Sequence, residues 1–131
     1  MKKIYQEIVQ AKIDNRKLLA ILLDPDKVDF DGLLLLTDKI KTSPATHIFV
    51  GGSIVETNKI DLLIQFLKDN LTIPILLFPG NPSQISTYAD GILFLSLLSG
   101  RNPVFLIDHH VKAVPKLKNT SLEIIPTGYL L

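Results

Sequence analysis

The stretch Leu18–Lys27, LLAILLDPDK, joins an apolar run of strand length to a charged turn. The apolar part, Leu18 to Leu23, shows no alternation of apolar and polar residues, which is typical of a strand buried on both faces of a parallel sheet. Similar runs follow along the chain at Ile48–Val50, Ile73–Phe78, Gly91–Leu95 and Leu122–Ile125. The sequence therefore predicts five strands, each buried on both faces.

Helical patterns lie before and between these runs. In Asn58–Asn70 the apolar residues recur at helical spacing and form one face. A helix over Asp31–Lys41 has a candidate N-cap carboxylate at Asp29 to Asp31. Further helices are predicted at the amphipathic N-terminus, over Pro82–Tyr88, and from Asn102 or Pro103 towards Lys118, with Pro115 kinking or ending the last one.

Strands that alternate with helices indicate βαβ units around a parallel sheet, so residues 1–131 form one α/β domain or part of one. Two architectures fit this pattern: a doubly wound open sheet and a (β/α)8 barrel. In both, ligands bind where the strands end. The segments directly after the strands are therefore where site residues are expected.

Composition excludes several classes of protein. The net charge is +1 and the basic residues are scattered, so nothing predicts a nucleic-acid partner or a polybasic membrane contact. Without cysteine, any metal must bind oxygen or imidazole ligands, and the absence fits the cytoplasm. No apolar stretch is long enough for a signal peptide or a transmembrane helix. Dinucleotide-binding, P-loop, nucleophile-elbow and zinc-protease motifs are also absent from the sequence.

The first two strands are each followed by candidate ligands. Asp24 opens an Asp-Pro-Asp-Lys turn that could hold a metal or a phosphate, although capping and turn formation explain it as well. Gly51 and Gly52 permit close backbone approach and N–H groups turned towards an anion, and Ser53 adds a hydroxyl. The alternative is a plain turn into a helix capped by Ser53. Asp24 and Ser53 could share one cation.

The later strands are also followed by polar residues. Gly80 lies in a Pro-Gly segment, which could equally be a simple turn. Arg101 could pair with phosphate bidentately, whereas an Arg at a helix start more often faces solvent. Tyr129 follows the fifth run and could instead pack at a barrel rim. His109 and His110 are adjacent and point apart on a helix, which favours solvated or capping roles over a metal site.

Taken in order, these segments resemble the geranylgeranylglyceryl phosphate synthase family, and most closely its bacterial branch. The motifs that carry the resemblance are Leu23–Lys27 (LDPDK), Phe49–Ser53 (FVGGS), Leu77–Gly80 (LFPG), Ser96–Pro103 (SLLSGRNP) and Ile125–Tyr129 (IPTGY). Each is short, but all five stand directly after a predicted strand and in the order of the family.

The resemblance implies a (β/α)8 barrel prenyltransferase, here about its first five βα units. Such an enzyme moves a prenyl group, C20 in many members, from its diphosphate to the 3-hydroxyl of sn-glycerol 1-phosphate in ether lipid synthesis. By the same resemblance, Mg²⁺ binds to Asp24 and Ser53. Substrate contacts are expected from Lys27, Gly51, Gly52, Gly80, Arg101 and Tyr129. A cytoplasmic homo-oligomer is expected for the full-length enzyme.

The sequence departs from the family in length, since eight βα units need roughly 250 residues. The family's Tyr-x-Glu segment, its later Gly-rich turns and its presumed catalytic carboxylate have no counterpart in these 131 residues. We therefore expect the metal and diphosphate end of the site to be present, the glycerol phosphate end to be absent, and this polypeptide alone to lack synthase activity. Two alternatives remain: a non-catalytic half-barrel that associates through its open sheet edges, and another phosphate-binding barrel enzyme.

Overall fold

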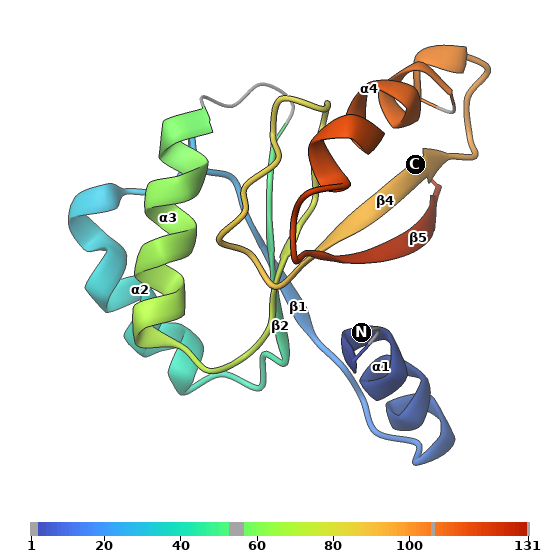
Figure 1. Cartoon of the computed structure of the whole chain (residues 1–131). Coiled ribbons are helices and arrows are strands. Elements are labelled where there is room, and N and C mark those ends of the chain that lie inside the picture. The colour runs from blue at the N-terminus through green and yellow to red at the C-terminus, as the bar shows by residue number, and fades with distance from the viewer. Residues whose placement is uncertain (1–2, 53–56, 106, 131) are drawn as a thin grey trace.

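The computed structural model describes residues 3–52, 57–105 and 107–130. Along the chain the elements are α1 (Lys3–Ile13), β1 (Ala20–Leu23), α2 (Leu33–Lys41), β2 (His47–Val50), α3 (Thr57–Asn70), β3 (Ile75–Leu77), β4 (Gly91–Leu97), α4 (Asp108–Leu117) and β5 (Glu123–Tyr129). Short 3₁₀ turns precede α2 and α4. Figure 1 shows the strands as one twisted sheet with helices on its flanks.

All strand pairs are parallel, and the strands lie side by side in chain order, β1-β2-β3-β4-β5. A doubly wound sheet reverses its strand order at a switch point, whereas a barrel adds each strand to the same side of the previous one. The observed order is that of a barrel. This confirms the prediction of a five-stranded part of a (β/α)8 fold.

The helices α2 and α3 form for the reasons that the sequence predicts. The Asp29 carboxylate accepts a hydrogen bond from the Asp31 N–H at 3.0 Å and caps the 3₁₀ turn that leads into α2. The apolar face of α3 is buried: Ile60, Leu63, Ile64 and Leu67 are each 0–1% exposed. Burial of a whole helix face supplies most of the stability of such a helix.

The core has two parts, one on each face of the sheet. On the outer face, Ile48, Val50 and Ile75 pack against α2, α3 and α4. On the inner face, Leu76, Leu93 and Ile125 pack against Ile4 of α1. Because successive side chains of a strand point to opposite faces, one apolar run supplies both cores.

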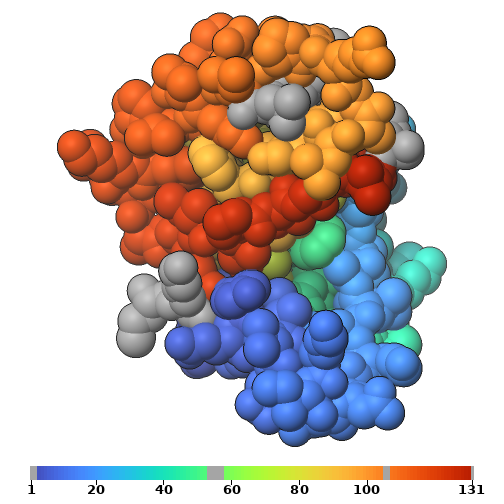
Figure 2. Space-filling model, turned by 90° about the vertical axis from the view of Figure 1, so that its right-hand side faces the viewer, coloured from blue at the N-terminus to red at the C-terminus, as the bar shows by residue number. Residues whose placement is uncertain are grey.

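Helix α1 closes the inner face at the end where the strands begin. The Glu123 carboxylate, on the first residue of β5, accepts hydrogen bonds from the N–H groups of Ile4 and Tyr5 at 2.7 and 2.8 Å. A carboxylate at a helix N-terminus satisfies free N–H donors and complements the helix dipole. Figure 2 shows the result, with α1 lying under the band of β5.

The prediction that every strand is buried on both faces is correct for β3 and wrong for β1 and β5. All three residues of β3 are buried, whereas Leu22 of β1 is 54% exposed and β5 alternates between buried and exposed positions along its first half. β1 and β5 are the outer strands and have one neighbour each. The first strand also begins later than predicted, because Leu18 and Leu19 precede it and are exposed.

Two strands run further than predicted. β4 continues to Leu97, and β5 continues to Tyr129. Tyr129 is therefore the last residue of a strand rather than part of a loop after it. Pro126, which directly follows the predicted fifth strand, pairs with Phe94 in the ladder. An outer strand tolerates proline because the missing N–H can face the unpaired edge.

The predicted helix over Pro82–Tyr88 is wrong, because this segment consists of turns and irregular backbone. The Asn81 carboxamide accepts a hydrogen bond from the Ser83 N–H at 2.8 Å, and the Asn81 carbonyl accepts one from the Gln84 N–H at 3.1 Å. Local bonds of this kind compete with helix formation. The segment is also too short to gain a buried helical face.

The fourth predicted helix is shorter than its pattern suggested. α4 occupies Asp108–Leu117 and contains Pro115 in its last turn. The helix therefore ends two residues after the proline. In the part of the chain that is described, no helix combines the length and apolarity needed to cross a bilayer.

Candidate functional site

A cavity of about 970 Å³ opens at the carboxyl ends of the strands. Such a volume lies at the upper end of the range for small-molecule sites. Its walls are mostly apolar and come from the sheet, from the segment after β3 and from α4. The residues predicted from the sequence that line it are Asp24, Lys27, Gly51, Gly52, Gly80 and Tyr129.

The strand register explains why these residues meet. Leu23 pairs with Val50, and Val50 pairs with Leu77, so β1, β2 and β3 end at one level. The residues that follow, Asp24 and Gly51, therefore stand side by side at this edge.

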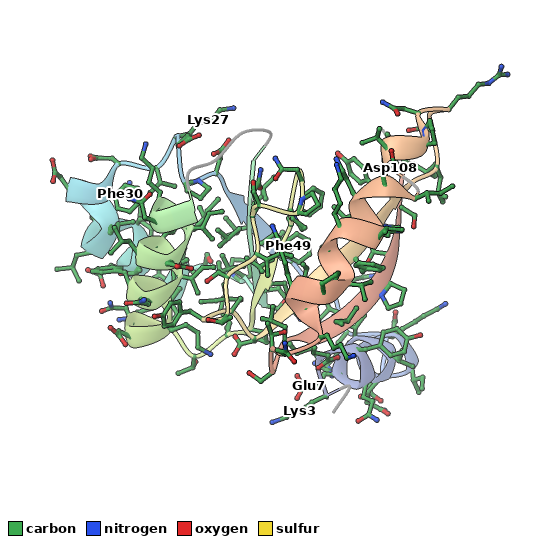
Figure 3. The ribbon with its side chains drawn as sticks, turned by 45° about the horizontal axis from the view of Figure 1, so that its top comes forward. Lys3, Glu7, Lys27, Phe30, Phe49 and Asp108 are labelled. Atoms are coloured by element: carbon green, nitrogen blue, oxygen red, sulfur yellow. The ribbon has the colours of Figure 1, made fainter. Side chains whose placement is uncertain are left out.

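One of the predicted residues that the structure describes is not brought to the cavity. Arg101 is exposed and does not belong to the lining, because β4 runs on to Leu97 and carries the following segment past the level at which the first three strands end. Ser53 lies outside the described residues. Lys27 lines the cavity but is itself exposed, and Figure 3 shows it at the periphery, pointing away from the molecule.

Asp24 is held by its own turn. Its carboxylate accepts a hydrogen bond from the Asp26 N–H at 3.0 Å, and its carbonyl accepts bonds from the N–H groups of Lys27 and Val28 at 2.9 and 3.1 Å. The other carboxylate of the motif is directed elsewhere, since Asp26 pairs with Lys59 at 3.4 Å. Of these two carboxylates, only that of Asp24 lines the cavity.

At Gly51 and Gly52 there is no room for a side chain. A Cβ on Gly51 would lie 1.8 Å from the carbonyl oxygen of Phe78, and one on Gly52 would lie 2.7 Å from the carboxyl atoms of Asp24. Neither glycine has a positive φ. A side chain at Gly52 would therefore displace the Asp24 carboxylate.

The N–H groups of these glycines are engaged within the protein. Gly51 donates to the Leu23 carbonyl at 3.1 Å, and Gly52 donates to the Gln84 side chain at 3.2 Å. The hypothesis that both N–H groups point at an anion is therefore wrong for this structure. Because they lack side chains, the two glycines instead allow the strand ends and the Asp24 carboxylate to lie close together.

Gln84 is a residue that the sequence did not single out. Its side chain is 1% exposed and bonds to Gly52 and Gly80, the glycines that follow β2 and β3. A lone glutamine in a polar turn carries no sequence signal for such a role, because its partners are backbone groups that only the tertiary structure brings within reach.

Aromatic and aliphatic side chains form the apolar part of the site. Phe78 stacks on Phe49 at a centroid distance of 6.0 Å and meets the ring of Tyr129 edge-on at 5.4 Å. Phe78 and Tyr129 line the cavity together with Leu93 and Leu95 of β4. The cavity thus combines an apolar wall with the Asp24 carboxylate in its lining, a combination suited to a ligand with an apolar tail and a charged head.

The expectation of a solvated or capping role is wrong for His110, and for His109 it stays a prediction. Both line the cavity, and neither side chain is fully exposed. The His110 ring stacks on Phe94 at 4.2 Å, and its Nε2 forms a hydrogen bond with the Leu95 carbonyl. His110 therefore attaches α4 to β4.

The donor set at the cavity fits a hard cation held by few protein ligands. Among the described residues, no three His, Asp or Glu side chains come together. One strand-end carboxylate, Asp24, is nevertheless compatible with Mg²⁺, which is commonly bound by one or two carboxylates together with waters and substrate phosphates. Binding of the metal would accordingly depend on the phosphates of the substrate.

A model of the PcrB family matches residues 11–131. The chain belongs to the PcrB family. The family's geranylgeranylglyceryl phosphate synthase from Flavobacterium johnsoniae is 60% identical over 128 residues, which are 98% of this chain and 53% of that protein. The synthase from Zunongwangia profunda is 50% identical over the whole chain and 56% of its own length.

A solved structure supports the same relationship. The (S)-3-O-geranylgeranylglyceryl phosphate synthase from Thermoplasma acidophilum, in complex with sn-glycerol 1-phosphate, superposes with a TM-score of 0.82 at 30% identity. The match covers 91% of this chain and 49% of that one. The chain thus spans about half the length of the curated relatives it matches. The resemblance seen in the five strand-end motifs is confirmed.

Proposed function

We propose that this chain forms the prenyl-diphosphate end of a geranylgeranylglyceryl phosphate synthase-type prenyltransferase. The observation that carries the proposal is the apolar cavity at the strand ends with the Asp24 carboxylate on its lining. The names of the PcrB relatives support the reaction class, a transfer of a geranylgeranyl or similar polyprenyl group to the 3-hydroxyl of sn-glycerol 1-phosphate.

In this reaction the bond between C1 of the prenyl group and the diphosphate oxygen breaks, and a bond from C1 to the glycerol oxygen forms. The hydroxyl proton passes to a base, and diphosphate leaves with the electron pair of the broken C1–O bond. Asp24 and Ser53 would hold Mg²⁺, which when bound neutralises the charge that develops on the diphosphate. The exposed ammonium of Lys27 would add positive charge at the cavity rim, on the side where the diphosphate is released.

The apolar wall would take the prenyl chain. Phe78, Leu93 and Leu95 bury apolar surface when a hydrocarbon chain lies against them, and each methylene so buried contributes roughly 0.8 kcal/mol. The same packing excludes water from C1 and thereby protects the reacting centre from hydrolysis. Gly80 and Tyr129 also line the cavity. Arg101 does not line it and stays a candidate contact for phosphate.

The glycerol phosphate end is assigned outside these 131 residues, because the motifs that the resemblance attaches to it are absent from the sequence. The acceptor, sn-glycerol 1-phosphate, is named as the bound ligand of the Thermoplasma relative. A cytoplasmic, homo-oligomeric enzyme fits the family and the lack of cysteine.

Isothermal titration calorimetry tests the proposal. The chain should bind geranylgeranyl diphosphate only when Mg²⁺ is present and should show no binding of sn-glycerol 1-phosphate alone. Asp24→Asn should weaken diphosphate binding at least about tenfold, because it removes the anionic metal ligand. Asp26→Asn, which changes the neighbouring carboxylate that pairs with Lys59, is the matched control and should bind nearly as the wild type does.

Three outcomes would contradict the proposal. Equal affinity of the Asp24→Asn variant and the wild type would remove Asp24 from the site. Formation of prenylated glycerol phosphate by the chain alone would show that the acceptor end is also present. A chain that binds no prenyl diphosphate but associates through its sheet edges would favour the non-catalytic half-barrel instead.

A further inference from the structure

Gln84 is buried behind the cavity and does not touch it. The side chain is 1% exposed and is not part of the cavity lining. A carboxamide is costly to bury unless its polar atoms find partners. The partners that Gln84 finds are therefore informative about its role.

Those partners belong to the segments that follow two different strands. The Gln84 Oε1 accepts hydrogen bonds from the N–H of Gly52 at 3.2 Å and from the N–H of Gly80 at 3.1 Å. The Nε2 donates to the carbonyl of Gly52 at 2.6 Å. One side chain thus binds both backbone polar groups of Gly52 and ties them to the segment after β3.

The backbone held in this way bears directly on Asp24. The Cα of Gly52 lies so close to the Asp24 carboxylate that a Cβ there would be 2.7 Å from both carboxylate oxygens. The position of Gly52 therefore limits where the carboxylate can sit. Since Gln84 fixes the N–H and the carbonyl of Gly52, it also constrains Asp24 through that glycine.

We propose that Gln84 is a positioning residue for the diphosphate end of the site, and that it acts through Gly52 and Gly80. Its amide sets the distance between the segments after β2 and β3 and keeps Gly52 against the Asp24 carboxylate. The side chain carries no charge and makes no contact with the ligand. This inference rests on the proposed function, because it assigns the diphosphate to the Asp24 side of the cavity.

Gln84→Met in the full chain tests the inference, since methionine has a similar length and lacks the amide. The ligand is inorganic pyrophosphate with Mg²⁺, titrated by calorimetry. We expect about tenfold weaker binding, because two N–H groups and one carbonyl lose their partner and the segments after β2 and β3 move apart. Farnesol, which has a prenyl tail but no diphosphate, should bind the variant and the wild type equally.

A spectroscopic signature separates positioning from a general loss of stability. In amide hydrogen exchange followed by NMR, Gly52 and Gly80 should lose protection in Gln84→Met. Gly51, whose N–H donates to the Leu23 carbonyl, should keep it. Thr37→Val is the matched control, because it removes another buried side-chain hydrogen bond, from Thr37 to the Leu34 carbonyl, far along α2 from the cavity. It should bind pyrophosphate as the wild type does.

Each result has a defined meaning. Wild-type affinity for pyrophosphate in Gln84→Met would overturn the inference, and the proposed function would stand if Asp24→Asn still loses binding. Equal losses of pyrophosphate and farnesol binding, or lost protection at Gly51 as well, would show a structural role only and would also overturn it. If the wild type binds no pyrophosphate, the proposed function fails and the inference fails with it.

Discussion

At the scale of single residues, the adjacent glycines Gly51 and Gly52 have different roles because different groups surround them. Gly51 faces the backbone directly after β3, because a Cβ there would lie 1.8 Å from the Phe78 carbonyl oxygen. Gly52 faces a side chain, the carboxylate of Asp24. The Phe78 backbone cannot yield without disturbing the hydrogen bond from its N–H to the Val50 carbonyl, whereas a side chain in a turn can rotate.

Alanine substitutions should therefore separate stability from binding. Gly51→Ala should lower the free energy of unfolding by about 3 kcal/mol, as overpacking against a backbone does. Gly52→Ala should cost only about 1 kcal/mol but displace Asp24 and weaken Mg²⁺-dependent diphosphate binding. Urea denaturation and calorimetry measure the two effects. Equal losses of stability in both variants would contradict the distinction.

At the scale of elements, α1 is attached to the sheet by few groups. Glu123 holds its first turn, and Ile4 fills the inner core. Next to this contact, His47 at the start of β2 is 8% exposed. Its Nδ1 lies 2.8 Å from the Thr46 hydroxyl, and its Nε2 has no hydrogen-bond partner among the described residues.

This environment makes stability depend on pH. Burial lowers the pKa of His47 from its ordinary value of 6.5, and the charge of Glu7 on α1 opposes that shift in part. Below pH 6.5 the unfolded chain binds this proton more readily than the folded chain, so the folded state loses stability as the pH falls from 6.5 towards the lowered pKa. Above pH 6.5 the residue makes no pH-dependent contribution.

His47→Gln should reduce this acid sensitivity. Thermal melting from pH 8 to pH 5 would measure the slope of stability against pH in the variant and the wild type. The variant should show the smaller decline, since glutamine does not titrate. His109→Gln, on the other side of the molecule, is the control and should keep the decline. Identical slopes in wild type and His47→Gln would refute the role of His47.

At the scale of the whole molecule, the sheet has two outer strands, each with one neighbour. The inner face near β1 carries Leu22, which is 54% exposed and lines the open cavity. Unpaired strand edges beside exposed apolar surface favour pairing with another chain. The unpaired strand edges and Leu22 together therefore form a candidate association surface.

The 131-residue chain should accordingly self-associate through this surface. Leu22→Glu should shift the mass measured by light scattering towards that of the monomer, because a buried carboxylate would oppose the contact. Leu35→Glu is the matched control, since Leu35 is 62% exposed on α2 and does not line the cavity. A monomeric wild type, or an equal effect of Leu35→Glu, would contradict the assignment of the surface.

Some features of this protein follow from local sequence alone. The apolar runs and the face formed by Ile60, Leu63, Ile64 and Leu67 predicted β2 to β4 and α3, because burial of periodic apolar residues decides these elements. The strand-end motifs predicted, as a resemblance, the relationship to geranylgeranylglyceryl phosphate synthases, which the similarity to the PcrB relatives confirms. The resemblance also predicted Asp24 as a site residue, a role that stays a prediction.

Other features were decided by tertiary contacts. Local turn bonds and the burial of Gln84 replaced the helix predicted over Pro82–Tyr88. The position of β5 at the sheet edge allowed Pro126 to remain in a strand. The N–H groups of Gly51 and Gly52 were taken by the Leu23 carbonyl and by Gln84. The sequence by itself determined which segments form strands and which strand ends carry polar groups, since these depend on neighbours along the chain. Only the tertiary structure decided which groups the N–H groups of Gly51 and Gly52 bind, because these partners lie 28 and 32 residues away along the chain.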